Sequence, residues 1–345
     1  MKNYLIQIKI LSGMLLLTMA IVIGFAFKAF AEEPEKFYKG KTIDWIVSSS
    51  PGSATDLLTR IAAVHFGKEI GAKVRIENMD QNKGVNHVFT RAKPDGLTFV
   101  SKATSAVLFN ELAKAPGIQY KSNDFIYLTD LMVDTGALFV KPGSPFTTLY
   151  ALRNKQGLKA GATSAKGFLS ASAAVLFEVV GLNGKVIPGY KGPPQVILAL
   201  AQNEVDFMVF QMASGLRQIK EGSLQPVFVT GKERFAAAPN IPTLEQLGVK
   251  ISSQWAGAFA LINESGQAVM APPGVPTDRI QFIRETFKRL SQKAEVRKEI
   301  ENLTGYWAPF EPGENMQTRI EEIMADKELG DRLTAVVNKY SAAAK

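Results

Sequence analysis

Short strand-like runs alternate with helix-period segments from residue 41 onward, and this alternation constrains the fold more than any other feature. Thr42–Val47 is rich in β-branched and aromatic residues, and residues 55–66 follow with apolar side chains at helical spacing. Residues 73–77 and 97–101 are the next predicted strands. Strands separated by helices usually pair in parallel through right-handed crossovers. The first part of the chain therefore predicts a mostly parallel sheet flanked by helices.

A second set of alternating segments begins near Gly136. Residues 137–141 and 205–210 are predicted strands, residues 167–180 a predicted helix, and residues 225–230 a strand that returns the chain. Neither junction carries a Pro/Ser-rich linker, so crossing strands should join the sets near Gly136 and Thr230. We predict an α/β fold of two lobes with a ligand cleft between them. Residues 32–136 and 231–345 form lobe 1, and residues 137–230 form lobe 2.

The composition excludes several chemistries. The 345-residue chain has no Cys and only two His, His65 and His87. Disulfides, thiolate nucleophiles, Fe–S clusters and Cys-based zinc sites are therefore excluded, and we predict neither a metal nor a cofactor. The net charge is +8, but Lys and Arg are not interleaved with aromatic residues in one segment, so no nucleic-acid partner is predicted. A mildly basic body favours encounter with anionic small molecules.

The N-terminus is typical of a secretory signal peptide. Residues 1–9 are lightly basic, residues 10–27 are an uncharged, mostly apolar run, and Ala29 and Ala31 form a small-x-small cleavage pattern. We predict a signal peptide over residues 1–31, cleavage after Ala31 and a periplasmic location. An uncleaved membrane anchor is the alternative, because eighteen apolar residues can just span a bilayer.

Two loops before predicted helices combine hydroxyl groups with glycine. In open α/β sheets ligands bind beyond the carboxyl ends of strands, where helix N-termini present free N–H groups. Residues 48–56 read SSSPGSATD, and residues 161–168 read GATSAKGF. A helix start with free N–H donors attracts carboxylates and phosphates. An ordinary capped turn is the alternative for the first loop, and a solvated surface lysine is the alternative for Lys166. Together the two loops predict that both lobes grip an acidic solute.

Catalytic motifs are missing from the chain. It contains neither phosphate-loop pattern, G-x-x-x-x-G-K-[ST] or G-x-G-x-x-G, and it lacks the G-x-S-x-G nucleophile elbow. Asp56 and Asp206 could form an acid–base pair, but helix-start capping and strand-end hydrogen bonding are the simpler explanations. We therefore predict that the protein is not an enzyme. An exported hydrolase that uses Asp56 or Asp206 is the weaker alternative.

A series of short motifs, in order along the chain, resembles the extracytoplasmic receptors of tripartite tricarboxylate transporters, the TctC or Bug family. Pro51-Gly52 with Thr55-Asp56 and Arg60 is similar to the family's Pro-Gly loop and helix start. Further matches are the segments VRIEN at 74–78, AKPDGLT at 92–98, YKG at 190–192, EVD at 204–206, PNIPT at 239–243 and PPGVP at 272–276. Each piece is only a turn signature, but their shared order covers nearly the whole mature chain.

The resemblance implies a type II-like periplasmic-binding fold that closes on a small carboxylate without a cofactor. It implies partner membrane subunits of a transporter and is consistent with a monomer. The predicted substrate-binding residues lie in the two loops, after the second strand and in the second lobe: Ser49, Ser50, Pro51, Gly52, Ser53, Thr55, Asp56, Gly84, Asn86, Thr163, Ser164, Lys166, Gly167, Phe168, Tyr190 and Asp206. Trp255 is expected near the hinge or cleft.

The chain also departs from the family pattern. Its first loop has three consecutive serines where the family has more Pro and Gly, and the start of the helix at 167–171 reads GFLSA without the family's frequent His. These departures concern the ligand more than the fold. A receptor that signals to a membrane protein, rather than delivering solute to a permease, is an alternative that the sequence leaves open.

Overall fold

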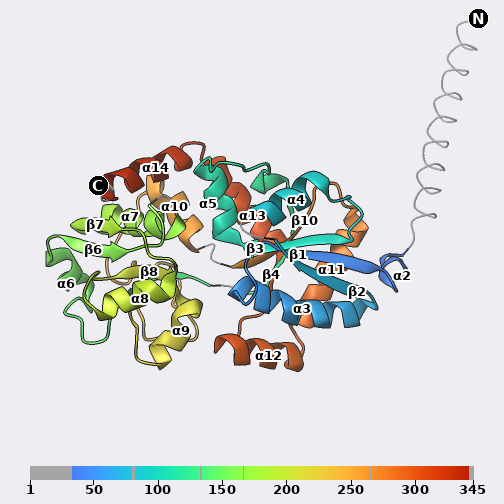
Figure 1. Ribbon diagram of the computed structural model, residues 1–345, viewed down its shortest axis with the longest axis horizontal. Helices are drawn as coiled ribbons and strands as arrows, with labels where there is room; N and C mark the ends of the chain where they lie inside the picture. The colour runs from blue at the N-terminus through green and yellow to red at the C-terminus, as the bar shows by residue number, and fades with distance from the viewer. Residues whose placement is uncertain (1–32, 80–81, 133, 166, 264–265, 342–345) are drawn as a thin grey trace, which may run out of the picture.

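The computed structural model describes residues 33–79, 82–132, 134–165, 167–263 and 266–341 (Figure 1). The predicted signal peptide and Lys166 lie outside these residues. Within the described part of the chain, no helix is both long enough and apolar enough to cross a membrane.

A six-stranded sheet organises one half of the molecule, the first lobe. Its order is β11-β4-β10-β3-β1-β2, and β1 pairs in parallel with both β2 and β3. The strands are β1 (Thr42–Val47), β2 (Lys73–Asn78), β3 (Thr98–Ala103), β4 (Ile126–Asp130), β10 (Gln267–Ala271) and β11 (Glu311–Pro312). The helices that follow or flank these strands are α2 (Pro34–Tyr38), α3 (Ala54–Ile70), α4 (Lys83–Arg91), α5 (Thr104–Leu112), α10 (Ser253–Asn263), α11 (Thr277–Leu290), α12 (Ala294–Thr304) and α13 (Gly313–Ala325), with a short 3₁₀ turn at Ser122–Asp124.

Five shorter strands organise the other half, the second lobe. The order β8-β5-β9 forms one sheet and β6-β7 another, and a bridge between Ala160 and Phe207 links the two. The strands are β5 (Gly136–Val140), β6 (Leu158–Gly161), β7 (Gly184–Ile187), β8 (Met208–Gln211) and β9 (Gln225–Val229). The helices are α6 (Leu149–Asn154), α7 (Phe168–Val180), α8 (Pro193–Ala201) and α9 (Met212–Lys220). In Figure 1 these elements lie together, to one side of β1–β3.

The sheets are mixed, which corrects the expectation that each would be mostly parallel. β10 pairs antiparallel with β3 and β4, and β5 pairs antiparallel with β8 and β9. The register explains the direction of β10: it starts at Gln267, opposite Ala103, where β3 ends. The chain returns from the second lobe to the end of the large sheet at which β3 finishes. Strand β10 starts there and must therefore run antiparallel to β3.

Aromatic side chains fill the core beneath β1. Trp45, Phe66, Phe99 and Phe287 are fully or almost fully buried, and their ring centroids lie 4.8–6.0 Å apart. Trp45 also donates its Nε1–H to Ser101 Oγ on β3, 2.7 Å away. These contacts fix α3 and α11 on one face of the sheet, and with them the loop that leads from β1 into α3.

The last helix packs against the second lobe. Tyr340 of α14 (Leu329–Tyr340) stacks on Phe177 of α7 with centroids 5.2 Å apart, and Lys339 pairs with Glu178 at 2.6 Å. Ser341 forms a strand-like bridge with Val186 of β7. Helix α14 thus lies beside α7 in Figure 1, although the predicted division assigns all of residues 231–345 to lobe 1. The residue boundaries of the lobes stay a prediction.

Candidate functional site

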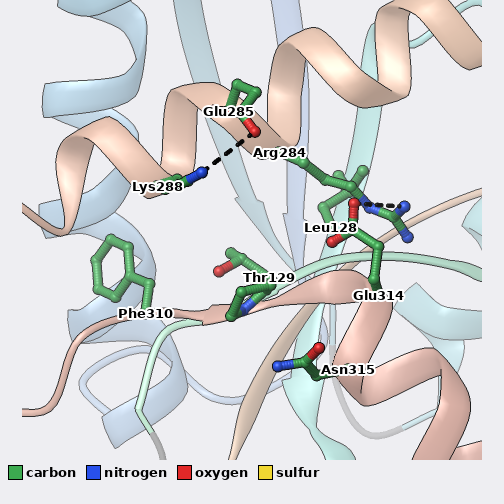
Figure 2. Close-up of a pocket in the computed structure, with 9 residues that line it drawn as sticks. Leu128, Thr129, Arg284, Glu285, Lys288, Phe310, Glu314 and Asn315 are labelled. Atoms are coloured by element: carbon green, nitrogen blue, oxygen red, sulfur yellow. Dashed lines mark ion pairs between the residues drawn. The ribbon is translucent and has the colours of Figure 1, made fainter.

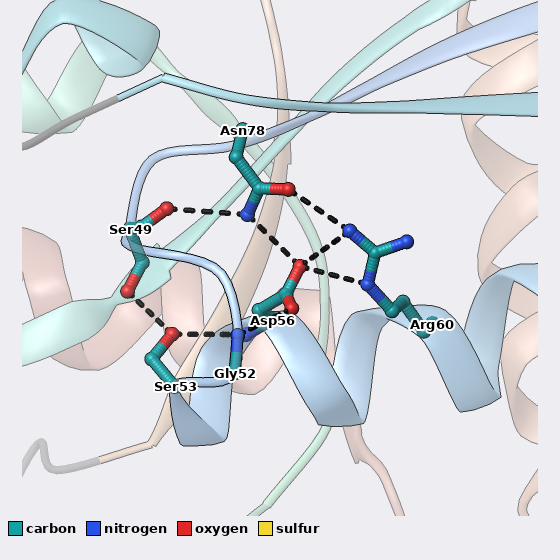
Figure 3. A network of polar contacts seen from close by, with 6 residues as sticks. All are labelled: Ser49, Gly52, Ser53, Asp56, Arg60 and Asn78. Carbon is teal, nitrogen blue, oxygen red and sulfur yellow. Dashed lines mark hydrogen bonds and ion pairs between the residues drawn. The ribbon is translucent and has the colours of Figure 1, made fainter.

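The first predicted loop is a turn closed by its own side chains (Figure 3). Ser53 caps α3 by accepting the backbone N–H of Asp56, and its hydroxyl lies 2.6 Å from Ser49 Oγ. Gly52 has a φ of +78°, which an L side chain rarely adopts, and its N–H donates to Asp56 Oδ2 at 2.8 Å. The loop is therefore held in one shape before any ligand arrives.

Asp56 is the centre of that network. Its Oδ1 accepts from Arg60 Nε at 3.0 Å and from Asn78 Nδ2 at 2.9 Å, and Asn78 Nδ2 also reaches Ser49 O. Burial by itself would raise the pKa of Asp56, but the hydrogen bonds from Arg60, Gly52 and Asn78 outweigh burial and lower the pKa below its usual range. A carboxylate with this many donors braces the loop and is a poor proton carrier.

The predicted residues of this loop divide into two sets. Ser50, Pro51 and Gly52 are exposed and Ser49 is half-buried, so these residues can reach a ligand. Thr55 is buried, and its hydroxyl donates to Gln267 Oε1 on β10 at 2.6 Å. Thr55 and Asp56 therefore hold the loop in position, and residues 49–53 present the contact surface.

Gly84 and Asn86 lie on α4, and each has a structural role. A Cβ at Gly84 would lie 2.9 Å from Ile46 Cγ2 and from Ser48 Cβ, so only glycine lets α4 pack this closely on β1. Asn86 donates to Gly117 O at 2.7 Å and accepts the N–H of Gln119 at 2.9 Å. Gly84 thus packs against the start of the first loop, whereas the Asn86 side chain bonds the 117–119 segment.

The second predicted loop precedes α7. Ser164 O accepts the N–H of Gly167 and, at 2.5 Å, the hydroxyl of the buried Ser170. Gly167 is the N-cap residue and provides no side-chain acceptor for the first turn of α7. Thr163 is half-buried and Ser164 is exposed.

Phe168 brings this loop to the first lobe. Its ring packs edge-on against Phe109 of α5 with centroids 6.2 Å apart. Helix α5 follows β3 directly, and β3 pairs with β1 through Ser101 and Val47. The start of α7 therefore lies near the sheet edge from which the first loop emerges.

The side chains of Tyr190 and Asp206 form hydrogen bonds with Glu204 and Lys159, and not with the described residues of either predicted loop. Asp206 Oδ2 accepts the N–H of Lys159 at 2.8 Å, and the N–H of Asp206 donates to Lys159 O, so this residue ties the segment before β8 to β6. That is the strand-end role considered as the alternative to an acid–base role. The Tyr190 hydroxyl reaches Glu204 Oε2 at 3.4 Å.

Several polar residues of this region escape prediction from sequence. Asn78 and Gln267 hold the first loop, and Lys102 donates from β3 to Ser48 O at 2.7 Å. Only Asn78 had a sequence signal, since it directly follows the second predicted strand, at residues 73–77. Gln267 bonds a residue 212 positions earlier in the chain, which no local pattern reveals.

The connection between the lobes contains a buried acid. Asp134 Oδ1 accepts the N–H groups of Thr135 and of Ala213 at the start of α9, at 2.7 and 2.8 Å. Burial raises the pKa of Asp134 to about 7 against the opposing effect of these backbone donors. Nearby, Asn263 Oδ1 accepts from the hydroxyls of Thr135 and Thr230 at 2.9 and 2.8 Å, so α10 is tied to both crossing segments.

A cavity of about 280 Å³ lies elsewhere in the first lobe, between α11 and α13 (Figure 2). Arg284 in its wall is already held by Tyr127 O and Glu314, and Lys288 lies 3.6 Å from Glu285. None of the predicted binding residues lines it. Another hollow, of about 200 Å³, lies against α14 and is lined by Trp255 together with Arg332 and Lys339. No group of three or more His, Asp or Glu among the described residues is placed to hold a metal ion.

Comparison with known proteins decides the family. The model of the tripartite tricarboxylate transporter family receptor matches residues 58–327. The chain belongs to this receptor family. Protein BugT of Bordetella pertussis is 27% identical over 270 residues, covering 75% of the chain and 79% of BugT. The resemblance seen in the sequence is confirmed.

Solved structures agree with the fold of the receptor. A TctC solute-binding protein from Polaromonas superposes with a TM-score of 0.70 at 18% identity, covering 88% of the receptor and 99% of that protein. MatC from Rhodopseudomonas palustris, solved with bound malate, gives 0.59 at 20% identity and coverages of 86% and 99%. A further R. palustris protein, solved with adipate, gives 0.64 at 18% identity and coverages of 86% and 97%. The predicted two-lobed, α/β periplasmic-binding fold is confirmed.

Proposed function

We propose that this receptor captures a small dicarboxylate or tricarboxylate between its lobes in the periplasm and delivers it to the membrane subunits of a tripartite tricarboxylate-type transporter. The observation that supports this most is the pair of helix starts. The exposed residues 50–52 precede α3, and the exposed Ser164 with the uncapped Gly167 precedes α7. Helix starts of this kind favour anions through their free N–H groups.

The contact between Phe109 and Phe168 supports a shared site for the two loops. It places the start of α7 beside α5, whose strand β3 neighbours β1. A ligand that touches both loops would stabilise the closed arrangement of the lobes, because only differential contacts shift such an equilibrium. The malate and adipate bound by the two R. palustris neighbours favour a dicarboxylate over a neutral solute.

Export and the partner subunits follow from the same proposal. A receptor of this family needs a location outside the cytoplasm to meet its solute, and residues 1–31 have the composition of a cleaved signal peptide. We propose that the mature receptor works as a monomer and needs no cofactor, since capture and release involve no covalent step.

Titration calorimetry with malate, adipate, citrate and a neutral sugar tests the proposal. We expect saturable binding of at least one carboxylate and none of the sugar. At 100 times its dissociation constant the ligand should add about 2.7 kcal/mol to the stability of the receptor, so thermal melting gives a second readout. Binding of the sugar alone would overturn the carboxylate proposal and leave the family assignment intact.

Substitutions in the two predicted loops test where the solute binds. Ser50→Val and Thr163→Val each remove a hydroxyl from one predicted loop, and each should weaken carboxylate binding about tenfold. Ser252→Ala, at an exposed serine before α10, is the matched control and should bind as the wild type does. Unchanged affinity in both loop variants would show that the solute binds elsewhere.

A further inference from the structure

Helix α4 presents three basic side chains to one open cavity. Lys83, His87 and Arg91 follow one another at intervals of four residues, so they lie on the same face of the helix. The cavity measures about 300 Å³, and its remaining lining residues are Met79, Asn86, Thr90 and Gln119. No acidic residue is among the described residues that line it.

Among the described residues, the basic groups of this cavity have no acidic partner. None of the three basic side chains forms an ion pair or hydrogen bond with another side chain of the described residues. Lys83 and Arg91 both carry positive charge on this face of the helix. Lys83, as the first residue of α4, meets the positive end of the helix dipole as well. Helix stability therefore accounts for Arg91, which lies in the last turn of α4, but not for Lys83.

Hydrogen bonds hold the polar residues that line the rest of the cavity. Asn86 fixes the 117–119 segment by bonding Gly117 O and the N–H of Gln119, at 2.7 and 2.9 Å. Thr90 Oγ1 donates to Asn86 O at 2.8 Å. These bonds hold the polar wall in place, and a preformed wall lowers the ordering cost of binding a ligand.

We propose that this cavity binds a small multivalent oxyanion, a dicarboxylate, a tricarboxylate or phosphate, at a site separate from the loops before α3 and α7. An anion with several oxygens can accept from the Arg91 guanidinium and from Lys83 at once, which a monovalent anion such as acetate does less well. The volume lies at the lower end of the range of small-molecule pockets. Met79 follows Asn78 directly, so an anion held here would lie one residue from the end of β2, whose Asn78 braces the first loop.

The two histidines make a direct test possible. His87 lines the cavity, whereas His65 on α3 lies 3.1 Å from Glu299. The imidazole C–H signals of the purified protein are recorded by NMR at fixed pH and ionic strength while citrate, phosphate, acetate or chloride is added. Assignment uses His65→Gln and His87→Gln. We expect citrate or phosphate to move the His87 signals saturably and to leave the His65 signals in place, and the comparison of the two anions identifies which chemistry is preferred.

Substitution of the basic residues tests whether the cavity is a specific anion site or only a solvated basic face of α4. The double variant Lys83→Gln/Arg91→Gln should weaken the apparent affinity about tenfold or more. Lys298→Gln, at an exposed lysine on α12, is the control and should titrate as the wild type does. A double variant that titrates as the wild type does, or equal His87 shifts with acetate and chloride, would overturn the proposal.

The same experiment distinguishes this site from the solute site between the lobes. The variants Ser50→Val and Thr163→Val should keep the His87 response, because they change neither lining residue nor charge in the cavity. A His87 response that disappears in these variants would overturn the separate site and assign the effect to binding at the two loops.

Discussion

At the scale of single residues, Asp56 shows how a charged group can hold a binding loop without taking part in binding. It is almost completely buried, yet three donors surround it: Gly52 of the loop, Arg60 of the next turn of α3, and Asn78 at the end of β2. A buried carboxylate is stable only when such donors compensate its lost hydration. The contact surface at residues 49–53 then carries no charged side chain.

Replacing Asp56 by Asn should lower the free energy of unfolding by about 1–3 kcal/mol at neutral pH, because hydrogen bonds to the charged carboxylate are lost or weakened. The folded-state pKa lies below the ordinary value of 3.8, so the carboxylate stabilises the fold above that pH. As the pH falls through the lower, folded-state pKa, this contribution disappears. Urea unfolding at neutral pH and below pH 3.8 should therefore show a difference between variant and wild type that shrinks in acid.

The control for this prediction is Asp331→Asn. Asp331 is exposed and pairs with Lys114 only at 3.3 Å on the surface, so its removal should change stability by less than about 0.5 kcal/mol. An Asp56→Asn variant as stable as this control at neutral pH would contradict the bracing role.

At the scale of elements, the distance between α4 and β1 is set by Gly84, which has no side chain. Gly84 lies against Ile46 and Ser48, and Ser48 is the residue with which β1 passes into the first loop. The same helix therefore supports the loop on one side and presents its basic face to the cavity on the other.

The direction of the stability change in Gly84→Ala tests how tightly α4 packs against β1. In an unobstructed helix this change stabilises a protein by about 0.5–1 kcal/mol. Here the added Cβ would lie 2.9 Å from two side-chain carbons, so α4 must move away from β1. We expect a loss of about 1–3 kcal/mol in urea unfolding, typical of an overpacked core, and weaker solute binding as Ser48 shifts. A more stable variant would show that the helix yields without strain.

Sequence reasoning predicts these elements better than their partners. The alternation of periodicities gave β1, α3, β2 and β3 nearly in place, since each depends on neighbours in the sequence. It did not give the direction of β10, which depends on where the chain returns from the second lobe. It also missed Gln267, because the group that needs it, Thr55, lies on a distant helix.

At the scale of the whole molecule, the two lobes meet at a small polar cluster on α10. Asn263 accepts from Thr135 and Thr230 and donates to Thr230 O and Phe259 O, so one amide joins both crossing segments to a helix. Any change in the angle between the lobes must turn about these bonds or break them.

Asn263→Ala should therefore affect stability and closure together. We expect a loss of about 1–3 kcal/mol in urea unfolding, since buried partners are left unsatisfied. Small-angle scattering should show a larger radius of gyration for the unliganded variant and a smaller relative change when a bound carboxylate is added. The control is Asn315→Ala, at an exposed residue of α13 whose side chain forms no hydrogen bond with a described residue. Identical scattering of wild type and Asn263→Ala would show that the cluster does not set the angle.

The packing of α14 on α7 has a consequence for the time course of folding. Synthesis of the chain proceeds from the N-terminus and presents α14 last, yet Tyr340 stacks on Phe177 and Ser341 forms a bridge with Val186, in elements made more than 150 residues earlier. Contacts so distant in sequence form slowly. The lobe that appears complete by residue 230 must keep an apolar face of α7 open until the final helix arrives, so the last dozen residues decide when the second half of the receptor is finished.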